Sequence, residues 1–76
     1  MMYQHYKGGL YILLFEATDS GNHEDEGQGM VVLQSVSNEE FYVRPEAEFE
    51  QPVLWPDGKT RPRFAEWHHI KGVIDP

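Results

Sequence analysis

The feature that most constrains this fold is a set of short apolar runs separated by turn residues. Each run alternates with a period of two and is rich in β-branched and aromatic side chains, which is typical of strands rather than helices. Turn-forming residues such as Gly8-Gly9 and Pro56–Lys59 stand between the runs. The runs cover residues 3–7, 10–17, 30–36, 41–44, 53–55 and 60–64. The chain is therefore predicted to be mainly β.

About five short strands at this spacing predict a small, strongly bent antiparallel barrel of the SH3-like type. Residues 45–49 begin with proline followed by acidic residues, which predicts one helical turn. Both faces of Leu10–Ala17 are largely apolar, so this strand is expected to lie centrally and to be covered on both sides. Two prolines in Thr60–Phe64 predict an edge strand. The alternative fold is a single open sheet with a C-terminal helix packed on it.

The length of 76 residues allows one small domain. We expect this domain to span residues 1–64, with residues 65–76 as a C-terminal extension. The absence of cysteine excludes a disulfide scaffold, a cysteine zinc site and a thiol nucleophile.

The net charge of −7 is unevenly distributed. Residues 1–50 carry ten acidic and only two basic side chains, whereas nucleic-acid backbones are bound by lysine and arginine. The longest mostly apolar stretch, Leu10–Phe15, is far shorter than the roughly 20 residues that span a bilayer. We therefore expect neither a nucleic-acid partner nor a membrane, and a cytoplasmic location.

Three blocks of sequence fall in a characteristic order. They are HYKGGLY at 5–11, VRPEAEF at 43–49 and PRF at 62–64. Together with Met30-Val31-Val32 they resemble family 1653 of the domains of unknown function, over residues 3–64. Leu33 stands where that family usually has tyrosine, and Tyr42 where it commonly has tryptophan. The resemblance implies a bacterial or phage origin and carries no established activity.

Half of the six basic residues, Lys7, Arg44 and Arg63, fall within these blocks. His5 and Lys7 are two positions apart, so on a strand they would project to the same face. Such a cluster beside tyrosines is suited to a small anion or a nucleotide. The predicted ligand-binding residues are His5, Lys7, Tyr11, Tyr42, Arg44 and Arg63. The alternative is structural: Arg44 and Arg63 pair with local acids and hold short strands together.

No motif supports catalysis or metal binding. The serines lack a nucleophile elbow, and Gly8-Gly9 lies between two strands rather than before a helix. His23–Glu26 is a contiguous run and His68 adjoins His69, arrangements that do not converge on a metal ion. We therefore predict no catalytic residue, no metal and no cofactor, and a small hydrolase or transferase is the least favoured class.

The sequence thus predicts a non-enzymatic binding module for a small anionic ligand. The alternative is a protein-interaction module, such as a phage-encoded inhibitor, that presents the acidic segment 18–29 with Glu39 and Glu40 to a basic partner. Exposed edge strands also allow a homodimer by sheet extension.

Overall fold

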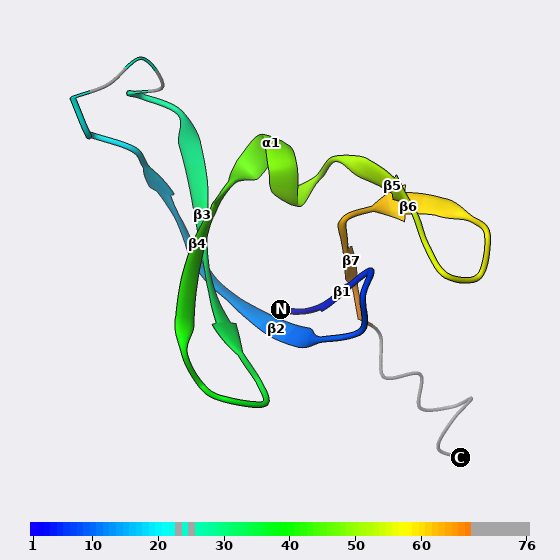
Figure 1. The fold of residues 1–76 in the computed structure, drawn as a ribbon. Helices are drawn as coiled ribbons and strands as arrows, with labels where there is room; N and C mark the ends of the chain where they lie inside the picture. Colours follow the sequence, from blue (N-terminus) through cyan, green and yellow to red (C-terminus); the bar gives the residue numbers. More distant parts are fainter. Residues whose placement is uncertain (23, 25, 68–76) are drawn as a thin grey trace.

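The computed structural model describes residues 1–22, 24 and 26–67, and most of this part of the chain is β-strand (Figure 1). The elements are β1 (Met2–His5), β2 (Leu10–Thr18), β3 (Gly29–Ser35), β4 (Phe41–Pro45), α1 (Glu46–Phe49), β5 (Pro52–Leu54), β6 (Thr60–Pro62) and β7 (Phe64–Glu66). The mainly β class and the helical turn near 45–49 are therefore confirmed. No helix among the described residues is long and apolar enough to cross a membrane.

Five strands form one antiparallel sheet in the order β4-β3-β2-β1-β7, and β5 pairs with β6 in a separate hairpin. The central position predicted for β2 is confirmed. Among the described residues, the outer strands β4 and β7 each have a single neighbour, so a closed barrel is not shown. The alternative of an open sheet describes this order better. That alternative also expected a C-terminal helix from residue 65 onwards. Residues 65 and 66 belong instead to strand β7, and residues 68–76 lie outside the described part.

The turn between β1 and β2 differs from the prediction in one respect. Strand β1 ends at His5, and a tight turn follows in which Gly8 has a φ of 115°. The His5 N–H donates to Gly9 O at 2.8 Å, and the Gly8 N–H donates to His5 O at 2.7 Å. Lys7 therefore belongs to the turn, and the expectation that His5 and Lys7 project from one strand face is wrong.

A register shift divides β2 into two halves. The shift lies between Leu13 and Phe15, and it reverses which side chains face inward. Tyr11 and Leu13 pack on the core before the shift, whereas Phe15 after it is 58% exposed. The expectation that β2 is covered on both sides is thus wrong for its second half.

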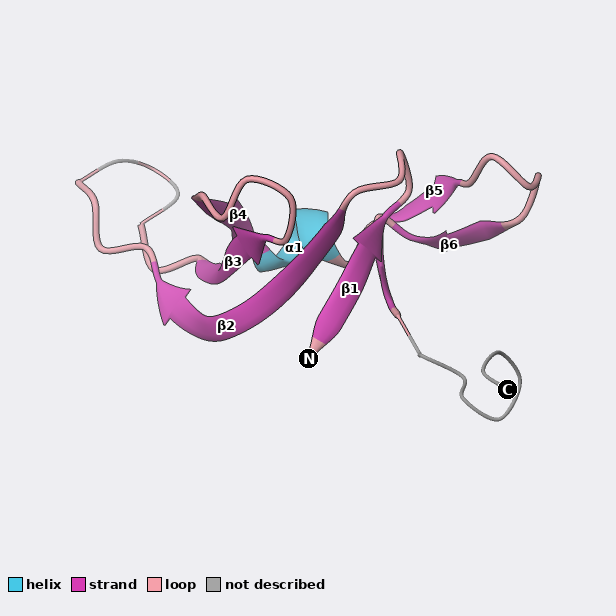
Figure 2. Cartoon of the chain, turned by 90° about the horizontal axis from the view of Figure 1, so that it is seen from below, coloured by secondary structure: helices cyan, strands magenta, loops and turns pink. Residues whose placement is uncertain are grey.

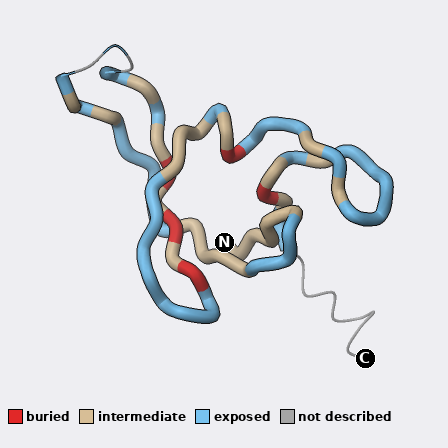
Figure 3. Tube along the Cα trace, viewed as in Figure 1, coloured by how far each residue is buried: buried red, intermediate tan, exposed pale blue. Residues whose placement is uncertain are grey.

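The core lies inside the curve of the sheet, and Figure 3 shows the buried segments arranged around the centre of the molecule. It consists of Val31, Leu33, Phe49 and Phe64. Val31 and Leu33 share the inner face of β3 because they are two positions apart. Pro45 starts α1 with a φ of −60°, and this single turn directs Phe49 onto Phe64, where the rings stack at 4.9 Å. The helical turn therefore serves to close the core.

The region predicted as one strand, Thr60–Phe64, is split into β6 and β7 at Arg63. The Arg63 N–H donates to Gln51 O at 2.8 Å, and Arg63 O accepts from the Tyr6 N–H at 3.0 Å. These two bonds join the β5–β6 hairpin to the β1–β2 turn. Figure 2 shows the hairpin standing at one end of the molecule, away from the β2–β3 loop. The position of Arg63 therefore creates a corner between the sheet and the hairpin.

Candidate functional site

Three of the six predicted ligand-binding residues surround the buried ring of Phe64. The ring centroids of His5 and Tyr11 lie 4.8 and 5.4 Å from that of Phe64, both in edge-on geometry. The Arg44 guanidinium carbon lies 5.4 Å from the same centroid. Strand pairing explains this convergence, because His5 lies opposite Phe64 between β1 and β7. The predicted cluster therefore forms, with a core residue at its centre.

A second ring, that of Tyr6, links the other two bases to this group. The Lys7 ammonium and the Arg63 guanidinium lie 5.7 and 5.6 Å from the Tyr6 centroid, within the range of cation–π attraction. Tyr6 in turn lies 4.7 Å from His5. The sixth predicted residue, Tyr42, is peripheral and joins the group through Tyr11, at 6.1 Å.

His5 experiences both burial and positive charge. Burial lowers the pKa of His5 below its usual value, and the charges of Arg44, Arg63 and Lys7 lower the pKa further. The Lys7 backbone N–H donates to His5 Nδ1 at 3.1 Å, which assigns the proton of the neutral ring to Nε2. The neutral imidazole is favoured in the folded state because burial disfavours the charged ring and because a fourth positive charge would be repelled.

The two arginines of the cluster already have partners. Arg44 Nη1 lies 2.6 Å from Glu48 Oε1, and Arg63 Nη2 donates to Gln51 Oε1 at 3.0 Å. The pairing of Arg44 with a nearby acid is what the structural alternative predicted. For Arg63 the partner is an amide rather than an acid, and its Nε is buried without a hydrogen-bond partner in the described part of the chain. Of the predicted bases, Lys7 is exposed, and among the described residues no carboxylate pairs with it.

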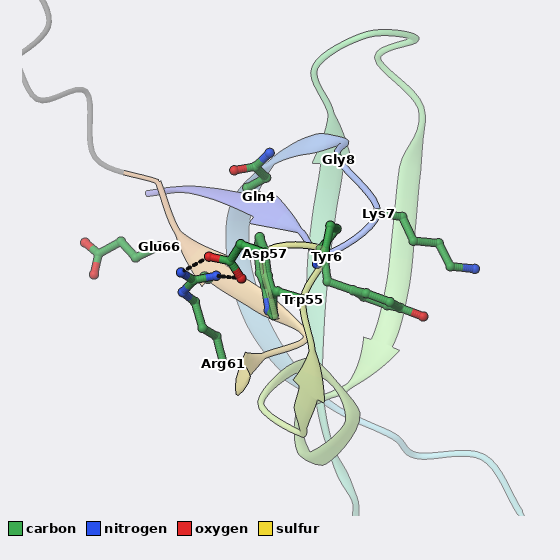
Figure 4. Close-up of a pocket in the computed structure, with 10 residues that line it drawn as sticks. Gln4, Tyr6, Lys7, Gly8, Trp55, Asp57, Arg61 and Glu66 are labelled. Atoms are coloured by element: carbon green, nitrogen blue, oxygen red, sulfur yellow. Dashed lines mark hydrogen bonds and ion pairs between the residues drawn. The ribbon is translucent and has the colours of Figure 1, made fainter. Parts of the chain in front are cut away.

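A hollow lies beside this cluster, between the β1–β2 turn and the β5–β6 hairpin (Figure 4). Its volume is about 530 Å³, and a neighbouring hollow of about 500 Å³ shares part of its lining. Tyr6, Lys7 and Trp55 line both hollows. Ligand pockets in proteins fall in this range of volumes and are typically lined by aromatic rings with a few polar groups. Of the predicted site residues, Lys7 lines these hollows and the other five do not.

Trp55 and Arg61 form the hairpin side of the hollow. Trp55 Nε1 donates to Pro62 O at 3.0 Å, which fixes the indole against the opposite strand. The Arg61 guanidinium carbon lies 5.2 Å from the Trp55 ring, and Arg61 forms two hydrogen bonds with the Asp57 carboxylate at 3.2 and 2.6 Å. This bidentate pairing with Arg61 lowers the pKa of Asp57. In Figure 4, Tyr6 and Lys7 extend away from the Asp57–Arg61 pair.

Sequence reasoning did not select Trp55 and Arg61 as site residues. The turn at Pro56–Lys59 was predicted and is confirmed, since the Trp55 N–H donates to Lys59 O and Gly58 adopts a φ of 88°. The available signal was an aromatic residue directly before this turn and an arginine two positions after it. Nothing in the sequence indicated that the hairpin would fold beside Tyr6 and Lys7.

No metal centre is present among the described residues: no three carboxylate or imidazole side chains there converge closely enough to hold an ion. In the run His23–Glu26, residues 23 and 25 lie outside the described part, as do His68 and His69.

The fold is a small, mainly β domain, and its hollow is lined by aromatic side chains together with two basic and two acidic ones. The family described as "Protein of unknown function (DUF1653)" matches residues 1–66, and the chain belongs to this family. The resemblance inferred from the three sequence blocks is thereby confirmed. No curated protein and no solved structure matches the chain. The domain boundary at residue 64 stays a prediction, two residues short of where the family match ends.

Proposed function

We propose that this protein is a non-enzymatic binding module for a small anion that carries a planar ring, with a nucleotide as the representative ligand. The observation that carries the proposal is the hollow lined by Tyr6, Trp55 and Lys7. Aromatic faces bind a base by stacking, and an ammonium without a carboxylate partner in the described residues binds a phosphate. Three of the other predicted residues, His5, Tyr11 and Arg44, act as support, because they pack around the buried Phe64.

The charges near the hollow are compatible with an anion. Asp57 is already neutralised by its bidentate pair with Arg61. Glu66 extends away from Tyr6 and Lys7 in Figure 4. Arg63 adds a second cation over the Tyr6 ring. A binding role is also favoured over catalysis because a carboxyl with a lowered pKa, as Asp57 has, is a weaker general base.

We further propose that the curved sheet and the β5–β6 hairpin form an incompletely closed barrel of the SH3-like type. The supporting observations are the antiparallel order of short strands and the core enclosed by their curvature (Figure 1). The helical turn α1 between β4 and β5 closes that core from one side.

Fluorescence titration of Trp55 tests the ligand proposal. In a Trp67→Phe background, Trp55 is the remaining indole. We expect AMP to quench its emission, with inorganic phosphate and adenosine each binding more weakly. Lys7→Ala should weaken AMP binding roughly tenfold through loss of a charge-assisted hydrogen bond, and Tyr6→Leu should weaken binding of adenosine as well.

Lys59→Ala is the matched control for Lys7→Ala. Lys59 is an exposed base on the hairpin that carries Trp55, and it does not line either hollow. This variant should bind AMP like the parent protein. The proposal would be overturned by the absence of any response up to millimolar AMP, phosphate and adenosine. An equal loss in Lys7→Ala and Lys59→Ala would show that only general electrostatic attraction operates.

A further inference from the structure

The free edge of β4 is unusual among the strand edges of the described chain. Within the described part of the chain, strand β4 has β3 on one side and no hydrogen-bonded neighbour on the other. Its segment Phe41–Val43 carries neither proline nor lysine, the residues that proteins place at edges to prevent pairing. Strands β5, β6 and β7 have only three residues each, whereas β4 has five, and its one proline, Pro45, is the last residue of the strand. The edge of β4 is therefore the most competent for pairing with another strand.

The ladder between β3 and β4 shows which backbone groups face this edge. The Ser35 N–H donates to Glu40 O at 2.9 Å, and the antiparallel register continues from there without a shift. Hydrogen-bonded and non-hydrogen-bonded pairs alternate along such a ladder. Tyr42 and Arg44 therefore direct their backbone groups to β3, whereas the N–H and C=O of Phe41 and Val43 point outward.

The outward edge is bordered by apolar side chains. Phe41 and Val43 are 65% and 59% exposed, on the face of the sheet opposite the core. The cross-strand row Phe15–Val32–Val43 continues this apolar face onto β3 and β2, and Phe15 is also exposed. An apolar face that reaches an unpaired edge favours continuation of the sheet into a second chain.

We propose that two copies of this chain associate through β4, antiparallel across a two-fold axis at Tyr42, to give one continuous sheet. This register sets Phe41 opposite the partner's Val43, where the outward N–H and C=O groups of both residues form four hydrogen bonds. It also sets the acidic Glu40 opposite the partner's Arg44, whose guanidinium bonds to its own Glu48 through Nη1 and has further N–H donors. A single pairing thus matches donors with acceptors, apolar with apolar side chains, and opposite charges.

The neighbouring registers match less well. A two-fold axis at Phe41 would set Val43 opposite the partner's Glu39, which has a left-handed φ of 61° and lies in a turn. A two-fold axis at Val43 would set Phe41 opposite the partner's Pro45, which has no N–H to donate. The second copy is favoured over an unrelated strand because the edge is self-complementary in charge and in its outward hydrogen-bonding groups. Pairing of β4 with a strand of a different protein, and contact between the faces of two sheets, are the other outcomes that the experiments below distinguish.

Sedimentation equilibrium of the full chain measures the association. We expect a reversible dimer at roughly 0.1–1 mM protein, strengthened by salt at about 0.5 M because each copy carries a net charge of −7. Amide hydrogen exchange at Phe41 and Val43 should slow as the concentration rises. A monomer throughout this range, or dimerisation that leaves these two amides unchanged, would overturn the proposal.

Val43→Pro separates edge pairing from contact between sheet faces. Because the Val43 N–H points outward, the substitution leaves the β3–β4 ladder intact but removes two of the four intermolecular hydrogen bonds. The dimer should weaken tenfold or more. Leu54→Ser is the control, because Leu54 is an exposed apolar strand residue on β5, 67% exposed, and the substitution keeps the net charge. Association should be unchanged in Leu54→Ser.

A charge-swap pair tests the register itself. Phe41→Lys and Val43→Glu should each abolish self-association, because a charge then faces an apolar residue twice in each homodimer. Mixing the two variants should restore a heterodimer, since Lys at 41 meets Glu at 43 and the remaining Val43 meets the remaining Phe41. Circular dichroism of each variant confirms that it is folded. Failure of the mixture to associate would exclude this register, and capture of either variant by a different strand would show a heterologous edge.

Discussion

Two arginines of this protein make the same contacts in different surroundings. Each is 2.6 Å from a carboxylate four positions away in the sequence, and each lies over an aromatic ring, at 5.4 and 5.2 Å. Arg44 does so above Phe64, which is 3% exposed, whereas Arg61 does so above Trp55, which is half-buried beside a hollow. The local chemistry is alike, so burial of the ring decides whether the arrangement supports the core or borders a surface hollow.

This difference shows that one type of contact can have two different roles in the same protein. An arginine beside an aromatic ring is the combination of residues expected in an anion pocket. Around Phe64 those residues are occupied with one another and with the core. Around Trp55 the corresponding residues border an open hollow, and Lys7 and Tyr6 line that hollow from the other side.

The largest expected effect is a difference in stability between variants of the two rings, Phe64 and Trp55. Phe64→Ala should lower the free energy of unfolding by about 3–5 kcal/mol, because it leaves a cavity among Phe49, His5 and Tyr11. Trp55→Ala should lower it by only about 1–2 kcal/mol, since less apolar surface is lost. Urea denaturation followed by far-ultraviolet circular dichroism measures both.

Phe64→Ala has the potential to unfold so small a domain, so Phe64→Leu supplies a milder variant that stays measurable. Equal losses in Trp55→Ala and Phe64→Ala would contradict the distinction between a core ring and a surface ring.

The next effect compares the arginines directly. Arg44→Ala should cost about 1 kcal/mol of unfolding free energy, through loss of the Glu48 pair and of the contact with Phe64. Arg61→Ala should leave stability unchanged within error, because its pair with Asp57 is solvated, and should instead alter the response of Trp55 to AMP. A stability loss in Arg61→Ala that matches that of Arg44→Ala would remove the contrast.

The smallest effect concerns pH and His5. The pKa of His5 is lowered on folding, so the unfolded chain binds the proton more readily. The contribution of neutral His5 to stability is therefore complete above the unfolded pKa of about 6.5 and is lost as the pH falls below it toward the folded pKa. The measurement is the difference in unfolding free energy between the wild type and His5→Gln across pH 5–8. A difference that stays constant over this range would show that His5 does not sense the surrounding cations.

Much of the local structure could be predicted from the sequence. The period-two runs located the strands, Pro45 with its following acids located α1, and Pro56–Lys59 located a turn. Each of these depends on residues within a few positions of one another. The family was also recognisable from three short blocks, which the match over residues 1–66 confirms.

The errors have long-range causes. The same-face expectation for His5 and Lys7 was wrong because β1 ends where its pairing with β7 ends, at His5. The second half of β2 is exposed because the register shift beside β3 reverses its faces. Strand continuity from Thr60 to Phe64 is broken because Arg63 bonds to two different segments.

The sequence by itself determined the mainly β character, the turns and the collection of bases and rings that the protein uses. Those properties follow from backbone preferences and side-chain chemistry that act between near neighbours. Only the tertiary structure decided that Arg44, His5 and Tyr11 surround a buried Phe64, while Lys7 and Tyr6 meet Trp55 at an open hollow. The physical reason is that strand pairing and the hairpin corner at Arg63 bring together residues that are distant in the chain.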